Sequence, residues 1–269
     1  MSRLKAEQKK LDEALALTLQ SLEIRERIED ILGQAASFHE VGYIKLVQGN
    51  LDRATGFLQQ ALDIRERIGD QEGQAATLNM LANLRNSQGN VAGAINFYQR
   101  SLDVIGQVGD GKARSSKVNS IAQFNLDAIA RLNREQGDLD KAIALYHKLL
   151  RINEHIGHEQ GRVGTLYELA LIKKEQGKVD ESISLFQQSL DIAERIGNDK
   201  WKVAALRWIG WLSAHVRKDY QTGIRYYQQS IKILEKTGSP EVAQDHQHIK
   251  QIQQMRQDQQ QVQKRQRAR

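Results

Sequence analysis

Apolar and polar positions along the chain follow the period of an amphipathic helix, and this pattern is itself repeated. Between residues 51 and 62, the apolar residues Leu51, Ala54, Leu58 and Leu62 are three or four positions apart, so they share one face of a helix. Similar blocks recur at intervals of 40, 40, 48, 40 and 41 residues, starting at Leu11, Leu51, Val91, Leu139, Val179 and Tyr220. The pattern predicts six related helices, which we call the B helices.

The segment before each of the last five B helices is also helical in pattern, and we call these segments the A helices. They share a column of small residues, which permits close approach of a partner helix, at Gly42, Ala82, Ala130, Ala170 and Gly210. Four turns between an A helix and its B helix contain a glycine suited to a left-handed helix end, at Gly49, Gly89, Gly137 and Gly177. The fifth turn, residues 215–220, lacks this glycine and is one residue longer. The sequence therefore predicts helix pairs with short connections.

These features resemble the tetratricopeptide repeat family. The small residue of each A helix, the Gln-Gly-Asn type of turn, the alanine early in the B helix and the aromatic residue after it (Tyr98, Tyr146, Phe186) match its pattern over roughly residues 10 to 238. The repeats are similar to the longer variant in kinesin light chains, Pins-type polarity adaptors and many cyanobacterial proteins. The resemblance implies an all-α fold, a right-handed superhelical solenoid of antiparallel helix pairs in which each repeat contacts its neighbours.

We expect a single solenoid over residues 1–255. It would contain a first B-type helix at residues 2–29 without an A partner, helix pairs at about 30–68, 70–108, 110–156, 158–196 and 198–236, and a polar capping helix at about 240–255. Residues 256–269 are basic and rich in glutamine, and they have no apolar stripe. A frayed or disordered tail is predicted there.

Composition excludes several classes of protein. The 269 residues include no cysteine, which excludes disulfides, thiolate catalysis and thiolate metal sites. No apolar run approaches a membrane span and the first residues lack the apolar core of a signal peptide, so we expect a cytoplasmic protein that does not contact membranes. Most of the net charge of +6 lies in residues 250–269, which hold six basic residues and one acidic residue.

No arrangement of residues in the sequence favours catalysis, a cofactor or a bound metal. Residues 106–113 fit most of a phosphate-binding loop, but they follow a predicted helix, and Ala113 stands where a magnesium-binding hydroxyl belongs. The pairs His155 with His158 and His246 with His248 lack the spacing of zinc ligands, which favours solvated surface histidines. We predict a protein that is not an enzyme and uses no cofactor.

The open side of the A helices holds the candidate binding residues. They lie at spacings of three and four on each helix, so they share a face, and the resemblance implies that this face lines a concave groove. Side-chain amides and guanidinium groups can form hydrogen bonds with an extended peptide, and aromatic rings can pack against its apolar side chains. The candidates are His39, Tyr43, Asn79, Asn83, Asn86, Asp127, Arg131, Arg134, Tyr167, Lys174, Arg207, Trp208 and Trp211.

This set predicts a protein–protein interaction adaptor whose ligand is an extended segment, acidic and partly apolar. In one alternative, these residues are ordinary solvated positions. In another, the chain binds nucleic acid or an anionic surface through its basic tail and the loop at residues 110–117, and in a third it is the sensor section of a larger signalling protein. Charge reversal at Arg65 and Arg67, at the end of a B helix, is expected to matter little for the ligand.

The first helix is apolar where later repeats are polar. Leu15 aligns with Thr55, and Leu19 aligns with a column of polar residues at Gln59, Gln99, His147 and Gln187. An exposed leucine cluster is an association surface. We therefore expect a second copy of the chain, or sequence upstream of it, to cover this helix, and the first case predicts a homodimer.

Overall fold

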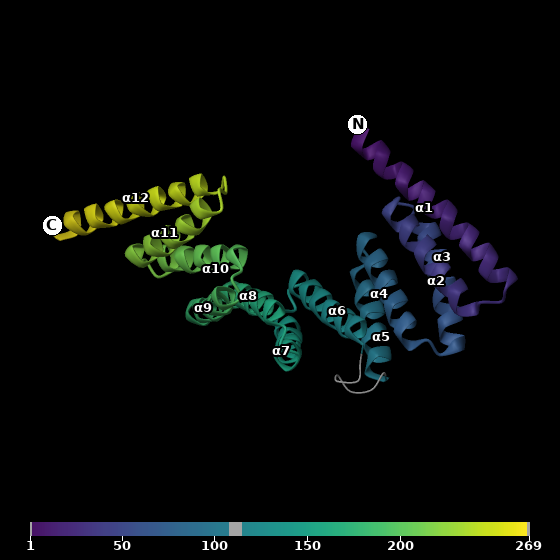
Figure 1. The fold of residues 1–269 in the computed structure, drawn as a ribbon. Coiled ribbons are helices and arrows are strands. Elements are labelled where there is room, and N and C mark those ends of the chain that lie inside the picture. The colour runs from purple at the N-terminus through teal and green to yellow at the C-terminus, as the bar shows by residue number, and fades with distance from the viewer. Residues whose placement is uncertain (1, 108–114, 268–269) are drawn as a thin grey trace. The chain divides into compact units, whose positions relative to one another are not determined.

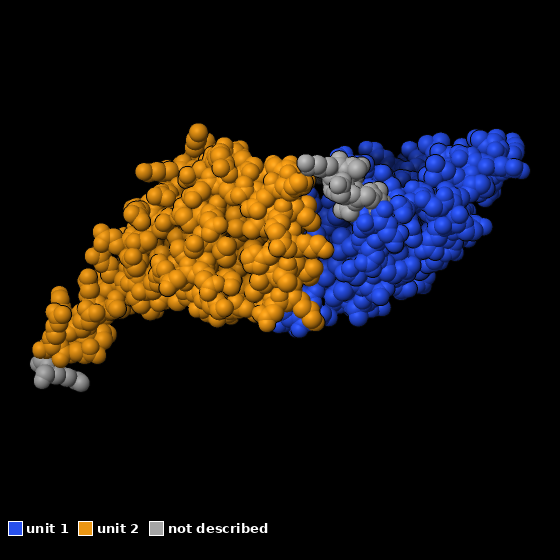
Figure 2. Space-filling model, turned by 90° about the horizontal axis from the view of Figure 1, so that it is seen from below, with its two compact units in different colours: residues 1–138 blue, residues 139–269 orange. Residues whose placement is uncertain are grey.

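The computed structural model describes residues 2–107 and 115–267, and every regular element in these two ranges is a helix. The predicted all-α fold is confirmed. The chain divides into two compact units, residues 1–138 and residues 139–269, which Figure 2 draws in blue and orange. Most of the predicted 110–117 loop and most of the rejected phosphate-binding segment lie outside the described residues.

The first unit is built from helix pairs (Figure 1). Helix α1 packs on α2, α2 pairs with α3, α4 pairs with α5, and α6 contacts both members of the second pair. The bounds are α1 (Ser2–Arg27), α2 (Ile31–Val47), α3 (Leu51–Ile68), α4 (Gln71–Ser87), α5 (Val91–Gln107) and α6 (Ser116–Glu135).

Helices α2 and α3 cross closely because Gly42 has no side chain. A Cβ atom on Gly42 would lie 2.7 Å from the Cγ of Leu58, which is closer than carbon atoms pack. The turns after α2 and α4 contain Gly49 and Gly89 with φ of +76° and +75°, the left-handed conformation that glycine adopts without strain. The small-residue crossing and the glycine turns are confirmed at these positions.

The second unit continues the same architecture. Its helices are α7 (Leu139–His155), α8 (Glu159–Glu175), α9 (Val179–Arg195), α10 (Asp199–Trp211), α11 (Tyr220–Lys236) and α12 (Val242–Arg267). A π-helical turn, η1 (Leu212–Val216), extends α10, which is how a helix absorbs one inserted residue. Lys218 takes the left-handed conformation, with φ of +61°, where the earlier turns have glycine. The longer fifth turn therefore changes the end of α10, but α10 still packs against α11.

Helix α12 continues beyond residue 255, where the capping helix was expected to end. It extends to Arg267, although every side chain after Met255 in the described part is exposed. Gln, Arg and Lys are good helix formers, and neither glycine nor proline interrupts residues 242–267. Helix propensity thus accounts for a helix there without an apolar stripe.

Arg65 joins α3 to the helix that follows it. The residue is only 8% exposed, and its Nη1 donates hydrogen bonds to the carbonyl oxygen of Gly73 at 2.7 Å and to Oγ1 of Thr77 at 2.5 Å. Its Nε lies 3.5 Å from Oδ2 of Asp70, the N-cap residue of α4. One guanidinium group therefore ties the end of a B helix to the first turns of the next A helix.

The same contact recurs one repeat earlier. Nη1 of Arg25 donates to the carbonyl oxygen of Gly33 at 2.9 Å and to Oγ of Ser37 at 2.7 Å, which joins α1 to α2. By contrast, Arg67 is exposed. Charge reversal at Arg65 would therefore disturb the contact between α3 and α4, whereas Arg67 serves as a control, and the small effect expected on the ligand stays a prediction.

Replacing Arg65 by alanine should lower the free energy of unfolding by about 2–4 kcal/mol, because two buried hydrogen bonds from a charged donor are lost. Arg67→Ala should change it by less than about 0.5 kcal/mol. Urea unfolding followed by circular dichroism compares the two variants. If both variants lost the same free energy of unfolding, Arg65 would not stabilise the contact between α3 and α4.

Candidate functional site

Two asparagines expected to bind a peptide backbone are hydrogen-bonded within the first unit. Nδ2 of Asn79 donates to Oδ1 of Asn125 at 2.5 Å, Nδ2 of Asn83 donates to Oδ1 of Asn79 at 3.3 Å, and the hydroxyl of Tyr98 donates to Oδ1 of Asn83 at 2.6 Å. Asn125 is fully buried. These side chains link α4, α5 and α6. Asn86, the third candidate asparagine of α4, is exposed.

The charged candidates of α6 lie one helical turn apart. Nε of Arg131 is 3.1 Å from Oδ2 of Asp127. Burial raises the pKa of Asp127, and the charge and hydrogen bond of Arg131 offset part of that rise. Arg131 is exposed, Arg134 is half-buried, and Tyr43 on α2 is 44% exposed. With Asn86, these residues are the accessible candidates of the first unit.

His39 belongs to the contact between α2 and α4. Its Nδ1 lies 3.2 Å from Oγ1 of Thr77, the hydroxyl that also accepts from Arg65. Burial, and then the positive charges of Arg65 and Lys117, lower the pKa of His39 from 6.5 to about 4. The imidazole is therefore neutral at pH 7.

Aromatic side chains of α8, α9 and α10 form a continuous cluster in the second unit. Nε1 of Trp208 donates to the hydroxyl oxygen of Tyr167 at 2.7 Å, and the Trp208 ring stacks on Phe186 with 6.0 Å between centroids. Trp211 packs edge-on against Trp208 at 5.9 Å. Nζ of Lys174 lies 4.3 Å from the centroid of Trp208, a cation–π contact. The structure thus brings together four predicted site residues from two successive A helices.

Arg207 binds the last helix. Its Nε donates to Oδ1 of Asp245 at 2.7 Å and its Nη1 donates to Oε2 of Glu241 at 2.5 Å. Asp245 is fully buried and also accepts from the hydroxyl of Ser230 at 2.6 Å. Two carboxylates therefore balance the charge of Arg207, and the bonds hold α12 against α10.

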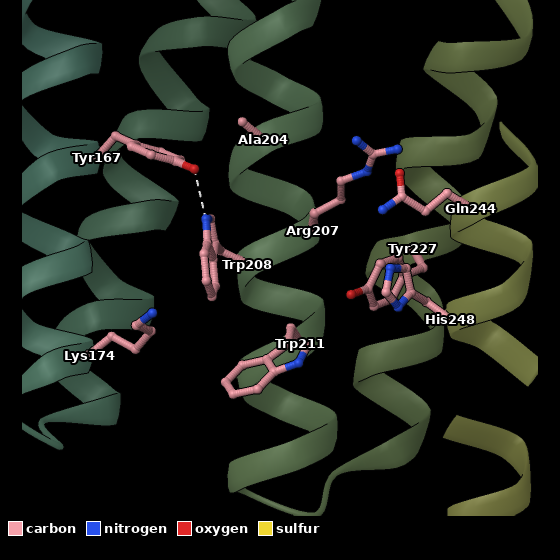
Figure 3. A pocket seen from close by; sticks show the side chains of 9 residues that line it. All are labelled: Tyr167, Lys174, Ala204, Arg207, Trp208, Trp211, Tyr227, Gln244 and His248. Atoms are coloured by element: carbon pink, nitrogen blue, oxygen red, sulfur yellow. Dashed lines mark hydrogen bonds between the residues drawn. The ribbon is translucent and has the colours of Figure 1, made fainter. Parts of the chain in front are cut away.

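A pocket of about 540 Å³ lies among α8, α10, α11 and α12 (Figure 3). Five predicted residues line it: Tyr167, Lys174, Arg207, Trp208 and Trp211. The other lining residues are Ala204, Tyr227, Gln244 and His248. A pocket of this size accepts a large side chain or a small ligand.

The sequence did not indicate the part of the pocket that α11 and α12 supply. Tyr227 occupies the aromatic column of the B helices, which is typical of the core, and His248 was expected to be a solvated surface histidine. Instead, the His248 ring stacks on Tyr227 with 5.2 Å between centroids. Helix α12 is not part of the repeats. Its packing against α11 brings His248 beside Tyr227 at the wall of the pocket.

The described residues form neither a metal cluster nor a membrane-spanning helix. Among the described side chains, no group of three or more histidines and carboxylates is arranged to hold a metal ion. None of the described helices combines the length and the apolar character needed to cross a bilayer.

Helix α1 exposes the leucine that was expected to form an association surface. Leu19 is 43% exposed, and Leu17 and Ile24 on the same helix are exposed as well. Leu15 is partly buried. Association through α1 stays a prediction.

Antiparallel helix pairs that cross at small residues and turn at glycine define a class of helical repeat protein. A family model for the tetratricopeptide repeat matches residues 33–106 and 162–236, and a second model for this repeat matches residues 126–160. The chain belongs to the tetratricopeptide repeat family.

Known structures share the fold at low sequence identity, and no curated protein sequence matches the chain. BtubC from P. vanneervenii is 15% identical, with a TM-score of 0.68, over 85% of this chain and 92% of that one. A signal-transduction ATPase with a tetratricopeptide repeat sensor, from Pyrococcus horikoshii, is 15% identical, with a TM-score of 0.74, over 94% of this chain and 37% of that one. Repeats of a putative kinesin light chain from Podosopora anserina are 18% identical, with a TM-score of 0.59, over 76% and 95%.

Acid should destabilise the first unit through His39. The folded pKa of about 4 is below the unfolded value of 6.5, so the unfolded chain binds more protons at intermediate pH. The stability that His39 contributes is present above pH 6.5 and is lost as the pH falls to 4, by about 2–3 kcal/mol. His39→Gln should remove this part of the decline. Urea midpoints of both proteins at pH 7 and pH 5 measure it, and equal declines would contradict it.

Replacing Arg207 by methionine should lower the free energy of unfolding by about 3–5 kcal/mol, because Asp245 stays buried without its cation. Adding Asp245→Asn should recover at least half of this loss, since the buried charge is gone. Urea unfolding measures both variants, and limited proteolysis of α12 shows where the structure opens. A loss of under 1 kcal/mol in the single variant would show that Arg207 does not hold α12.

Proposed function

We propose that the chain is a non-enzymatic scaffold that binds an extended segment of a partner protein along the A-helix face of its units. The pocket of the second unit carries the proposal. Its ammonium group and three of its aromatic rings, those of Tyr167, Trp208 and Trp211, come from two successive A helices, and such a combination suits a side chain of a bound polypeptide.

Membership in a family of protein-binding repeats supports the proposal. The similar ATPase from Pyrococcus horikoshii has such repeats as its sensor, which also suits the idea that this chain senses a ligand within a larger signalling protein. In both cases the ligand would contact the same face.

The burial of the candidates divides them into two roles. His39, Asn79, Asn83 and Arg207 hold helices together, and Asp127 pairs with Arg131, so the effect of these five on a ligand would be indirect. The residues proposed to touch the ligand directly are Tyr43, Asn86, Arg131, Arg134, Tyr167, Lys174, Trp208 and Trp211. Their guanidinium, ammonium and aromatic groups favour a segment that is acidic and partly apolar.

Affinity capture from the source cells, followed by crosslinking, tests this function. The variant Lys174→Glu with Trp211→Ser should lose at least tenfold of a captured protein, because a cation and an aromatic anchor are removed. Arg53→Glu, at an exposed position of α3, is the control and should retain it.

Equal capture by all three proteins would place the ligand elsewhere. Capture of nucleic acid, with affinity that falls steeply between 50 and 200 mM salt, would support the basic tail as the binding element in place of this face.

A further inference from the structure

The walls of the pocket in the second unit suit a flat ring. The rings of Trp208, Trp211 and Tyr227 line it, and Ala204 leaves room between the helices (Figure 3). Tyr227 is held in place, because its ring stacks on His248 and a Cβ atom on Gly210 would be 3.1 Å from it. An aromatic side chain of a ligand could pack edge-on or offset against the parts of these rings that their neighbours leave open.

Tyr227 also brings a hydrogen-bond donor to the pocket. The residue is only 2% exposed, and Figure 3 shows its hydroxyl oxygen on the side of the ring nearer to Trp208 and Trp211. No partner for this hydroxyl is found in the part of the chain that the structure describes. Burial, and then the negative charge of Asp245, raise the pKa of Tyr227 to about 12, so the hydroxyl keeps its proton at neutral pH. The hydroxyl is therefore a donor at the pocket wall, to which a ligand can offer an acceptor.

The charge of the pocket is positive. Lys174 places its ammonium group over Trp208, and none of the nine lining residues is acidic. Arg207 is already balanced by Glu241 and Asp245. Lys174 is therefore the cation open to a ligand carboxylate.

We infer that this pocket selects an aromatic side chain flanked by carboxylates in the bound segment. The ring packs against Trp208 and Trp211, a carboxylate on one side of it accepts from Lys174, and a carboxylate on its other side accepts from the hydroxyl of Tyr227. The inference rests on the proposed function and names the chemistry of its partner at this one site.

The three tryptophans of the sequence permit a direct test on the full chain. Trp208 and Trp211 line the pocket, whereas Trp201 does not. Indole N–H signals of ¹⁵N-labelled protein, assigned by Trp→Phe substitution, are followed while acetyl-Gly-Glu-Phe-Glu-Gly-amide is added. Two control peptides have Ala in place of Phe, or Lys in place of both Glu.

The acidic aromatic peptide should shift the signals of Trp208 and Trp211 more than that of Trp201, and it should bind at least tenfold more tightly than either control peptide. Binding of a control within twofold would overturn the inference. Free phenylacetate that binds as tightly as the peptide would also overturn it, because the site would then take a small aromatic acid and not a protein segment.

Two substitutions test the named groups. Tyr227→Phe removes one oxygen and keeps the stacked ring, and Lys174→Gln removes the charge. Each should weaken the acidic aromatic peptide by about fivefold or more, in keeping with the loss of one hydrogen bond to a charged group. Lys148→Gln, on the exposed side of α7, should leave the affinity unchanged. Unchanged affinity in both pocket variants would contradict the inference.

The result is separable from the proposed function. A captured partner that depends on Trp211, together with no preference among the peptides, would leave the scaffold function standing and overturn the pocket chemistry. Absence of both capture and peptide binding would overturn both.

Discussion

The helix pairs depend on crossings at positions with little or no side chain. At Gly42 a Cβ atom would meet Leu58, and at Gly223 it would lie 2.7 Å from the Cβ of Ala214. Packed interiors do not accept an added methyl group without displacing a neighbour. At Gly210 the neighbour is the ring of Tyr227, 3.1 Å away, so the crossing that builds the last pair also sets a wall of the pocket.

Polar contacts between successive helices supplement these crossings. Arg65, Thr77 and His39 belong to three different helices, and they meet at one hydroxyl group. These hydrogen bonds form only while all three helices are docked, which makes neighbouring repeats cooperate. The asparagines of α4 act in the same way between α5 and α6.

The repeat period was sufficient to predict the helical segments and the glycine turns, because both follow from spacing along the chain, whereas the expected pair at 110–156 stays a prediction. The period could not separate Arg65 from Arg67, which depends on the direction in which the next helix lies. The length of α12 was also missed, since a helix formed by propensity alone has no apolar pattern. In the site, Tyr167 was predicted together with Lys174, and Arg207 with Trp211, because each pair shares a face of one helix. The partners of Asn79 could not be foreseen, because Asn125 is 46 residues away on another helix.

Helix α12 is both a packed neighbour of α11 and a wall of the pocket, through Gln244 and His248. A ligand that touches these side chains binds only while the helix is docked. Thermodynamic linkage then requires that ligand to lower the equilibrium constant for local opening of α12 by a factor of one plus its concentration divided by its dissociation constant. Amide hydrogen exchange at the start of α12 would therefore record occupancy of the pocket, and any modification that loosens this helix would release the ligand without altering an A helix.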